Sequence, residues 1–185
     1  MNVYDFDGTI YRGDSSVDFW IFCMKRHPGI ILDLPGQIFA AIKCKLGAID
    51  KLRFKERYFS FLRRLKDPRA EVSLFWDAKQ KRIKEWYLNR KQEDDLIISA
   101  SPEFLLNEIC RRTGIRHLIA SDVDIASGTF ASPNCYGSEK LRRFKEAFPE
   151  TSIEEFYSDS RSDQCLAEIA EKAFIVKGDK VREWG

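Results

Sequence analysis

The stretch that decides the fold is Asn2-Val3-Tyr4-Asp5-Phe6-Asp7-Gly8-Thr9, at the start of the chain. Its first three residues form a short, partly apolar lead-in that predicts a strand, and two carboxylates follow directly. On an ideal strand Asp5 and Asp7 share a face, where their charges repel unless a cation or a proton lies between them. Gly8 permits a sharp exit from the strand. Taken alone, the motif is equally consistent with an acidic turn after an edge strand, so it has to be judged with the rest of the chain.

Charge is distributed unevenly along the 185 residues, of which 44% are hydrophobic. Between Arg12 and Arg90, 18 Lys and Arg oppose 9 Asp and Glu, a balance of +9, whereas the remaining residues carry 13 against 20, a balance of −7. A basic segment is therefore inserted in an acidic one. The five cysteines are odd in number and form no CxxC pair, which argues against a disulfide framework or a zinc site and indicates reduced thiols.

The sequence predicts a cytoplasmic protein. No apolar run approaches the roughly 20 residues needed to span a bilayer. Because the first strand begins at residue 2, we expect no room for a signal peptide.

Residues 15–90 are predicted to be helical. Apolar spacing and Pro or Gly breaks place helices over 17–24, 30–34 (stopped by Pro35-Gly36), 37–46, 51–66 and from Pro68 through Tyr87. The aromatic stripes of these helices are expected to pack in a core rather than contact a ligand.

Strands and helices alternate from residue 91 onward, which indicates a parallel α/β sheet that the opening strand must join. Strands are predicted at 96–99, 117–120, 155–158 and 173–176, and a hairpin at 123–130. Helices are predicted from Ser101-Pro102, with Ser101 as N-cap, to Thr113-Gly114, and over 137–148 and 163–172.

Polar side chains fall where these elements change, at strand ends or helix starts, and that edge of an open α/β sheet is where ligands bind. They are Asp5 with Asp7, Ser99, Lys140, and Asp159 with Asp163. Lys140 lies in the first turn of its predicted helix, where the dipole disfavours a cation, so an anion is expected nearby. Each of these residues taken singly also has an ordinary explanation as turn, cap or surface chemistry.

Together, the order Asp-x-Asp-Gly-Thr, strand-end Ser, helix-start Lys and Asp-x-x-x-Asp resembles the haloacid dehalogenase-like (HAD) superfamily over the whole chain, and within it the phosphoserine-phosphatase-like subfamily IB. The resemblance implies a three-layer, Rossmann-like parallel core with strand order 5-4-1-2-3 and an inserted all-helical cap of the C1 type. The core would comprise residues 1–14 and 91–185, and the cap residues 15–90.

The resemblance also implies a Mg²⁺-dependent phosphomonoester hydrolase. Asp5 would be the nucleophile that forms an aspartyl-phosphate, and Asp7 the acid and base, with its backbone carbonyl on the metal. Asp159 would be the other carboxylate ligand of the metal, and Asp163 would orient a water of the metal shell or Lys140.

The phosphate group would lie against Ser99, Ala100 and Lys140, with backbone N–H groups at the following helix start.

The substrate stays open at this point. Asp14, nine residues after the nucleophile, and a cap arginine, Arg53 or Arg57, favour a small anionic phosphometabolite such as a phosphoamino acid. The last of the four motifs, Asp-x-x-x-Asp, differs from that of phosphoserine phosphatases. Their motif is similar to Gly-Asp-Gly-x-Asn-Asp, whereas this chain has Ser158-Asp159-Ser160-Arg161-Ser162-Asp163. That segment is closer to the branch with phosphatidylglycerophosphate phosphatases, so a lipid substrate is the alternative.

The same residues also bear on other functions and partners. A non-enzymatic, phosphorylatable signalling module would lack both the acid two residues after the phosphorylated Asp and the long helical insert. Nucleic acid is not expected, because the basic residues are interleaved along amphipathic helices. Transient contact of the apolar segments 30–34 and 38–42 with a membrane surface stays open, as does the oligomeric state.

Overall fold

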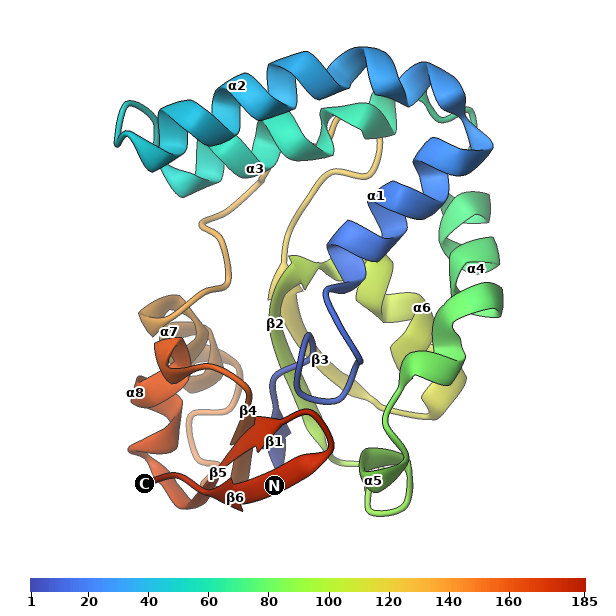
Figure 1. Ribbon diagram of the computed structural model, residues 1–185. Coiled ribbons are helices and arrows are strands. Elements are labelled where there is room, and N and C mark those ends of the chain that lie inside the picture. Colours follow the sequence, from blue (N-terminus) through green and yellow to red (C-terminus); the bar gives the residue numbers. More distant parts are fainter.

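The computed structural model describes residues 1–185 and has one six-stranded sheet with helices on both faces (Figure 1). The strands are β1 (Val3–Tyr4), β2 (Leu96–Pro102), β3 (His117–Ser121), β4 (Ile153–Ser158), β5 (Ala170–Lys177) and β6 (Lys180–Glu183). They lie in the order β3-β2-β1-β4-β5-β6. The first five are parallel and follow the predicted order 5-4-1-2-3, so the α/β fold is confirmed.

One strand was not predicted. β6 pairs antiparallel with β5 at the edge of the sheet. Its sequence, Lys-Val-Arg-Glu, has a single apolar residue, so no alternation of apolar and polar residues marks it as a strand.

The helices divide between the insert and the core. The α-helices are α1 (Ser15–Arg26), α2 (Leu34–Lys45), α3 (Lys51–Phe59), α4 (Pro68–Lys79), α5 (Glu85–Leu88), α6 (Glu103–Thr113), α7 (Ser138–Ala147) and α8 (Gln164–Ala167). Short 3₁₀ segments are η1 (Pro28–Asp33), η2 (Ser60–Arg64), η3 (Gln80–Arg82) and η4 (Arg161–Asp163).

The central strands are buried on both faces, as parallel strands covered by helices are. In β1, Val3 belongs to the apolar cluster under α7 and α8, and Tyr4 belongs to the larger cluster on the other face. The same alternation separates Phe156 from Tyr157 in β4. This two-sided burial gives the three layers of the predicted core.

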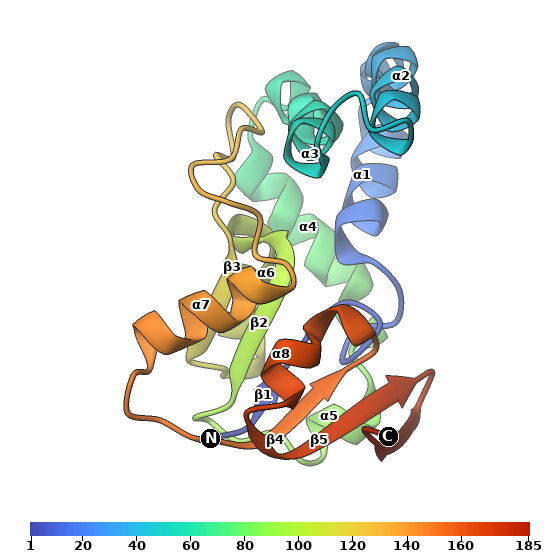
Figure 2. The same cartoon turned by 90° about the vertical axis from the view of Figure 1, so that its left-hand side faces the viewer.

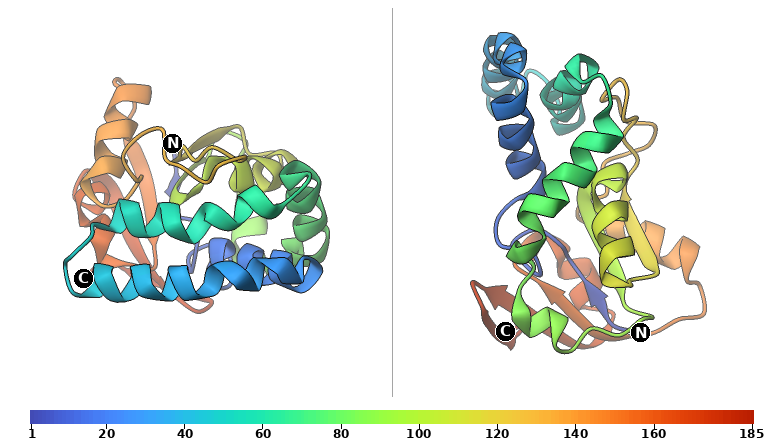
Figure 3. Two further views of the ribbon diagram at one scale, coloured as in Figure 1. Left: turned by 90° about the horizontal axis from the view of Figure 1, so that it is seen from above. Right: turned by 90° about the vertical axis from the view of Figure 1, so that its right-hand side faces the viewer.

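The helical insert is not packed as one body away from the sheet. α2 and α3 lie side by side above the edge where the strands end, whereas α4 and α5 lie beside the sheet (Figure 1, Figure 3). In α4, Trp76 donates from Nε1 to the carbonyl of Leu105 at 2.7 Å, and in α5 the Tyr87 ring lies 4.9 Å from that of Tyr4. The division into a core of 1–14 with 91–185 and a cap of 15–90 remains a prediction.

The single helix predicted from Pro68 through Tyr87 is wrong between residues 80 and 84. There the chain pairs with the loop after β1: Arg12 N–H donates to Arg82 O at 2.9 Å, and Lys84 N–H donates to Ile10 O at 2.8 Å. Lys84 is 2% exposed, and its Nζ donates to the carbonyls of Gly8 and Gly178. Tertiary pairing overrides the helical pattern here, and the end of the insert braces the acidic loop.

Three other local predictions need correction. Pro35 stands in the first turn of α2 instead of stopping a helix, a position where proline lacks no required N–H. The helix predicted over 163–172 ends at Ala167, because Ala170 already pairs with Ile153 in the sheet. The hairpin at 123–130 is reduced to a turn with one bridge between Val123 and Phe130.

No helix in the structure combines the length and apolar character needed to cross a membrane.

Candidate active site

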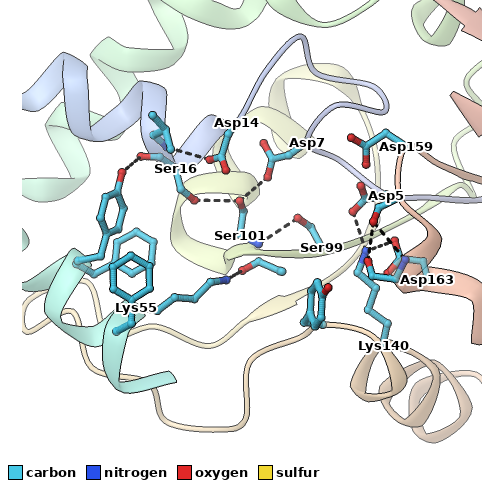
Figure 4. Close-up of a pocket in the computed structure, with 18 residues that line it drawn as sticks. Asp5, Asp7, Asp14, Ser16, Lys55, Ser99, Ser101, Lys140, Asp159 and Asp163 are labelled. Carbon is cyan, nitrogen blue, oxygen red and sulfur yellow. Dashed lines mark hydrogen bonds and ion pairs between the residues drawn. The ribbon is translucent and has the colours of Figure 1, made fainter. Parts of the chain in front are cut away.

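A cavity of about 340 Å³ lies between the ends of the central strands and the underside of α3 (Figure 4). The sheet order places β1, β2 and β4 side by side, so the residues at their C-terminal ends meet on the cavity floor. Asp5, Ser99 and Asp159 arrive there from these three strands. Lys140 and Asp163 reach the same place from α7 and η4.

Lys140 joins two carboxylates at the bottom of the cavity. Its Nζ donates to Asp5 Oδ1 at 2.7 Å and to Asp163 Oδ2 at 2.8 Å, and its side chain is 3% exposed. Burial alone would lower the pKa of Lys140, but the two carboxylates outweigh burial and raise it. The lysine is therefore held as a cation, which explains why a positive charge is stable in the first turn of α7.

The negative charge of Asp5 is disfavoured by burial. Burial raises the pKa of Asp5, Lys140 opposes this rise, and the charges of Asp163 and Asp159 add to it. The second oxygen, Oδ2, accepts a hydrogen bond from Thr9 Oγ1 at 3.2 Å. Two donors, Lys140 and Thr9, thus orient Asp5, but the single positive charge of Lys140 does not balance the nearby carboxylates.

Asp7 points to the start of the insert. Its carboxyl accepts from the Ser15 N–H of α1 at 2.6 Å and from Ser101 Oγ at 2.5 Å. Burial raises the pKa of Asp7 to about 7, and the neighbouring Asp14 carboxylate adds to the rise. A carboxyl that titrates near neutrality can both give and take a proton at working pH.

Ser101 has a different task from the one predicted. β2 continues to Pro102, so Ser101 is a strand residue and not the N-cap of α6, and its hydroxyl is directed at Asp7. Its backbone N–H donates to Ser99 Oγ at 3.1 Å, which leaves the Ser99 hydroxyl proton free to point into the cavity. The Ala100 carbonyl, also on the cavity wall, accepts from Lys55 Nζ at 2.9 Å.

Asp159 lies directly over Gly8. A Cβ at residue 8 would collide with Asp159 Oδ2, and Gly8 has φ +73°, so this approach of backbone and carboxylate requires glycine. The backbone of Asp159 is fixed by its N–H, which donates to Thr9 Oγ1 at 2.8 Å. Its carboxylate has no hydrogen-bond donor, and burial raises its pKa.

The acidic side chains suit a hard divalent cation. No three His, Cys, Asp or Glu side chains converge on a single point. Asp5 and Asp159 nevertheless both face the cavity, and the buried Asp163 Oδ1 has no partner. Magnesium typically takes one or two protein carboxylates and completes its shell with water and phosphate oxygen, so this donor set fits it.

The cap contributes a lysine instead of the predicted arginines. Lys55 on α3 enters the cavity, where its Nζ donates to Ala100 O and, at 2.7 Å, to Asn134 Oδ1. Arg53 and Arg57 are exposed and do not line the cavity, and Arg57 lies against Gly36 of α2. The α3 aromatics give a sequence signal for the role of Lys55, because Phe54 and Tyr58, four residues apart, line the cavity together with it.

Asp14 lines the cavity, and it also caps α1 by accepting from Val17 N–H at 2.9 Å; its contact with a substrate stays a prediction.

The loop between β3 and α7 closes the side of the cavity. It rises from the core to α3 and the η2 segment that follows it (Figure 1, Figure 2), where Arg63 of η2 donates to Ser127 O and Glu56 of α3 accepts from Phe130 N–H. Tyr136 of this loop lines the cavity. The cap and the core thus meet through this loop as well as through Lys55.

The cavity has a surplus of negative charge. Five aspartates line it, Asp5, Asp7, Asp14, Asp159 and Asp163, against two lysines, Lys55 and Lys140. A phosphate dianion entering this space meets repulsion that only a bound cation or proton transfer can relieve.

The comparison with known families agrees with this geometry. The profile of the haloacid dehalogenase-like hydrolases matches residues 3–168, which include every residue of the cavity floor. The chain belongs to the haloacid dehalogenase-like hydrolases. The predicted family is therefore confirmed, and with it the prediction that the chain is a hydrolytic enzyme.

Several solved structures resemble this one at low sequence identity. A protein of unknown function from Bordetella pertussis Tohama I superposes with a TM-score of 0.74 at 16% identity, covering 94% of this chain and 87% of its own. A phosphoserine phosphohydrolase-like protein from Francisella tularensis subsp. tularensis SCHU S4 gives 0.57 at 16% identity, with 94% and 86% covered. A phospho-aspartyl intermediate analogue of phosphoserine phosphatase gives 0.52 at 15% identity, with 92% and 83% covered.

At these identities the likeness shows a shared fold, and no curated protein matches the chain in sequence.

We predict that Lys140→Met destabilises this HAD hydrolase by about 3–5 kcal/mol at pH 8 in metal-free buffer, because it leaves Asp5 and Asp163 buried without a cation. The loss should be smaller at pH 5. Since burial raises the folded-state pKa of Asp5, stability is lost as pH rises through that value and regained when the carboxyl protonates. Urea unfolding at the two pH values measures both effects. Lys145→Met, an exposed lysine of the same helix, is the control, and equal stability of the two variants would contradict the prediction.

Proposed function

We propose that the chain is a Mg²⁺-dependent phosphomonoester hydrolase that works through an aspartyl-phosphate on Asp5. The observation that carries the proposal is the setting of Asp5: a buried lysine fixes one of its oxygens at 2.7 Å, and four further aspartates line the same cavity, which holds only one other lysine. Such a site suits a substrate that brings phosphate together with a divalent cation.

Magnesium, held by Asp5, Asp159 and the backbone carbonyl of Asp7, would neutralise the phosphate and the carboxylates so that the two can approach. The fit rests on oxygen donors alone, including the half-buried Asp159 carboxylate that lacks a hydrogen-bond donor.

The chain's own residues supply the chemistry of both half-reactions. Asp5 attacks phosphorus and forms the aspartyl-phosphate, while the ester P–O bond breaks and Asp7 gives its proton to the leaving alcohol. Asp7, now a carboxylate, takes a proton from the water whose oxygen attacks the same phosphorus. Inorganic phosphate leaves and Asp5 is restored. A pKa of about 7 suits both tasks of Asp7.

The phosphate oxygens have donors in place. Lys140 is a permanent cation beside Asp5, and the Ser99 hydroxyl proton is free because Ser99 acts only as an acceptor toward Ser101 N–H. These donors are fixed before substrate enters, so they cost no reorganisation when charge develops on the phosphoryl oxygens. The family profile and the phosphoserine-phosphatase names of the structural neighbours support the same reaction.

We propose a small anionic phosphometabolite, such as a phosphoamino acid, as the substrate. A cavity of about 340 Å³ is at the lower end of ligand pockets, which favours a small molecule. Asp14 and Lys55 offer one charge of each sign above the floor, the pair that an ammonium and a carboxylate on one substrate would need. Lys55 replaces Arg53 and Arg57 as the cap residue that we expect to contact the substrate.

A lipid phosphate of the phosphatidylglycerophosphate type is the second candidate. The apolar side chains exposed on the cap, among them Leu32 at 70% and Leu46 at 77%, favour it, because a lipid substrate is met at a membrane surface.

Removal of the metal tests the core of the proposal. With excess chelator, hydrolysis of a generic aryl phosphate should fall to background, because the surplus carboxylates then repel the phosphate. Added Mg²⁺ should restore the rate. Full activity in chelator would contradict the mechanism.

Substitution of the two motif aspartates separates their roles. Asp5→Asn should abolish both turnover and the acid-stable labelled phosphoenzyme trapped by rapid quenching. Asp7→Asn should slow turnover by about 10²- to 10⁴-fold, because it removes the proton donor but leaves the nucleophile. Near wild-type turnover of Asp5→Asn would show that the nucleophile is misassigned.

The pH dependence of kcat/KM tests Lys55. Burial lowers the pKa of Lys55 to about 8, so its charge is present at pH 7 and lost as pH rises to 9. For a carboxylate-bearing phosphate, KM should therefore rise over this interval in the wild type. Lys55→Arg should keep a flat KM, because a guanidinium stays charged, and Arg53→Lys is the matched control with a wild-type profile. Identical KM profiles for wild type and Lys55→Arg would remove Lys55 from the substrate site.

A further inference from the structure

The exposed apolar side chains of the molecule are concentrated on one segment of the cap. Of the eleven large hydrophobic side chains that are exposed, six lie between residues 31 and 46. We call them the cap stripe: Ile31, Leu32, Ile38, Phe39, Ile42 and Leu46. Five of them lie on η1 and α2, and Leu46 directly follows α2, which runs along the top of the molecule in Figure 1. Exposed apolar residues scattered singly are ordinary, whereas a concentration of them on one face is typical of an interaction site.

The bulky apolar residues of α2 face outward, whereas a helix that packs on a core turns them inward. Its buried positions are Gln37 and Ala40, and Gln37 Nε2 donates to Tyr58 O of α3 at 3.0 Å. The bulky apolar residues point the other way, with Phe39 at 59% exposure. Core packing therefore does not account for the cap stripe, because the helix contacts α3 through its small and polar side.

Two lysines border the stripe. At about 100° per residue, Ile38, Ile42, Leu46 and Phe39 fall within a sector of about 100°, with Lys45 just beyond one edge and Lys43 beyond the other. Lys43 Nζ lies 4.5 Å from the centre of the Phe39 ring, so its stem covers the border of the stripe. Helices that lie in the plane of a membrane surface have this arrangement of an apolar face with lysines along its edges.

The charge around the stripe selects the partner. Residues 25–66 contain eleven Lys and Arg against three Asp and Glu, a balance of +8. A second copy of the chain would bring the same charge to the same face and be repelled, whereas an anionic surface is attracted. α2 has 12 residues, so it can lie in an interface but cannot cross one.

We propose that the cap stripe docks the protein onto an anionic lipid bilayer, with α2 in the interface plane and Lys43 and Lys45 at the headgroups. This docking does not depend on the phosphatase reaction, since it uses the face of the cap that lies away from the cavity. Binding can therefore fail while hydrolysis stands, and hydrolysis can fail while binding stands.

Flotation with vesicles tests the proposal without turnover. The full chain should bind vesicles of phosphatidylcholine with about one third phosphatidylglycerol at about 0.1 M salt, and binding should weaken steeply at about 1 M salt. Binding to pure phosphatidylcholine should be much weaker. No binding to the anionic vesicles, or equal binding to both kinds, would overturn the proposal.

Variants locate the surface. Phe39→Glu should weaken binding at least about tenfold, because a charge replaces a ring that would be buried in the bilayer interface. The pair Lys43→Glu and Lys45→Glu should weaken it about 25-fold or more, since each lysine contributes about fivefold near an anionic surface. Leu74→Glu on α4 and the pair Lys81→Glu and Lys180→Glu are the matched exposed controls and should bind as wild type.

Circular dichroism and melting temperature confirm that each variant is folded, as expected for exposed positions. Wild-type binding by both stripe variants overturns the proposal. Sedimentation velocity without lipid should give one species at all concentrations. A dimer that Phe39→Glu disperses, together with absent vesicle binding, would assign the stripe to a second copy of the chain and overturn the lipid partner.

Discussion

The buried contact of Lys140 with Asp5 and Asp163 is the interaction on which the site depends. It joins the end of β1, the first turn of α7 and the segment after β4, three regions that are distant in sequence. Removing two carboxylates and one ammonium from water costs free energy. The charge-assisted hydrogen bonds between them, at 2.7 and 2.8 Å, offset part of this desolvation cost. The cluster keeps a net negative charge, which makes the neighbouring Asp159 and the cavity receptive to a cation.

The helical insert helps to hold the site in place and does not only cover it. Its last segment returns to pair with residues 10–12, and Lys84 binds the carbonyl of Gly8, the residue that lets Asp159 approach. Its first helix donates the Ser15 N–H to Asp7. Both ends of the insert therefore hold the loop that carries Asp5 and Asp7, so the folding of the insert and the geometry of the site are coupled.

The residues that sequence analysis identified are those whose position follows from topology. Asp5, Ser99 and Asp159 stand at the ends of neighbouring parallel strands, and strand order alone brings them together. The residues it missed depend on side-chain direction or on local chain length. Ser101 is a partner of Asp7 and not a helix cap because β2 extends three residues beyond the predicted strand end at Ser99. Lys55 lies on a helix whose aromatic face predicts packing in a core and not a place at the cavity.

Electrostatics acts on two length scales in this molecule. Over about a Debye length, the basic residues of the cap attract anions, whether a soluble phosphate or a lipid surface. Within the cavity the sign reverses, because five carboxylates oppose two lysines. On the mechanism proposed above, an anion attracted to the cap reaches Asp5 only when a cation or proton offsets the local charge. Attraction outside the cavity and this condition inside it would together favour a phosphate that brings a bound metal over other anions of the same charge.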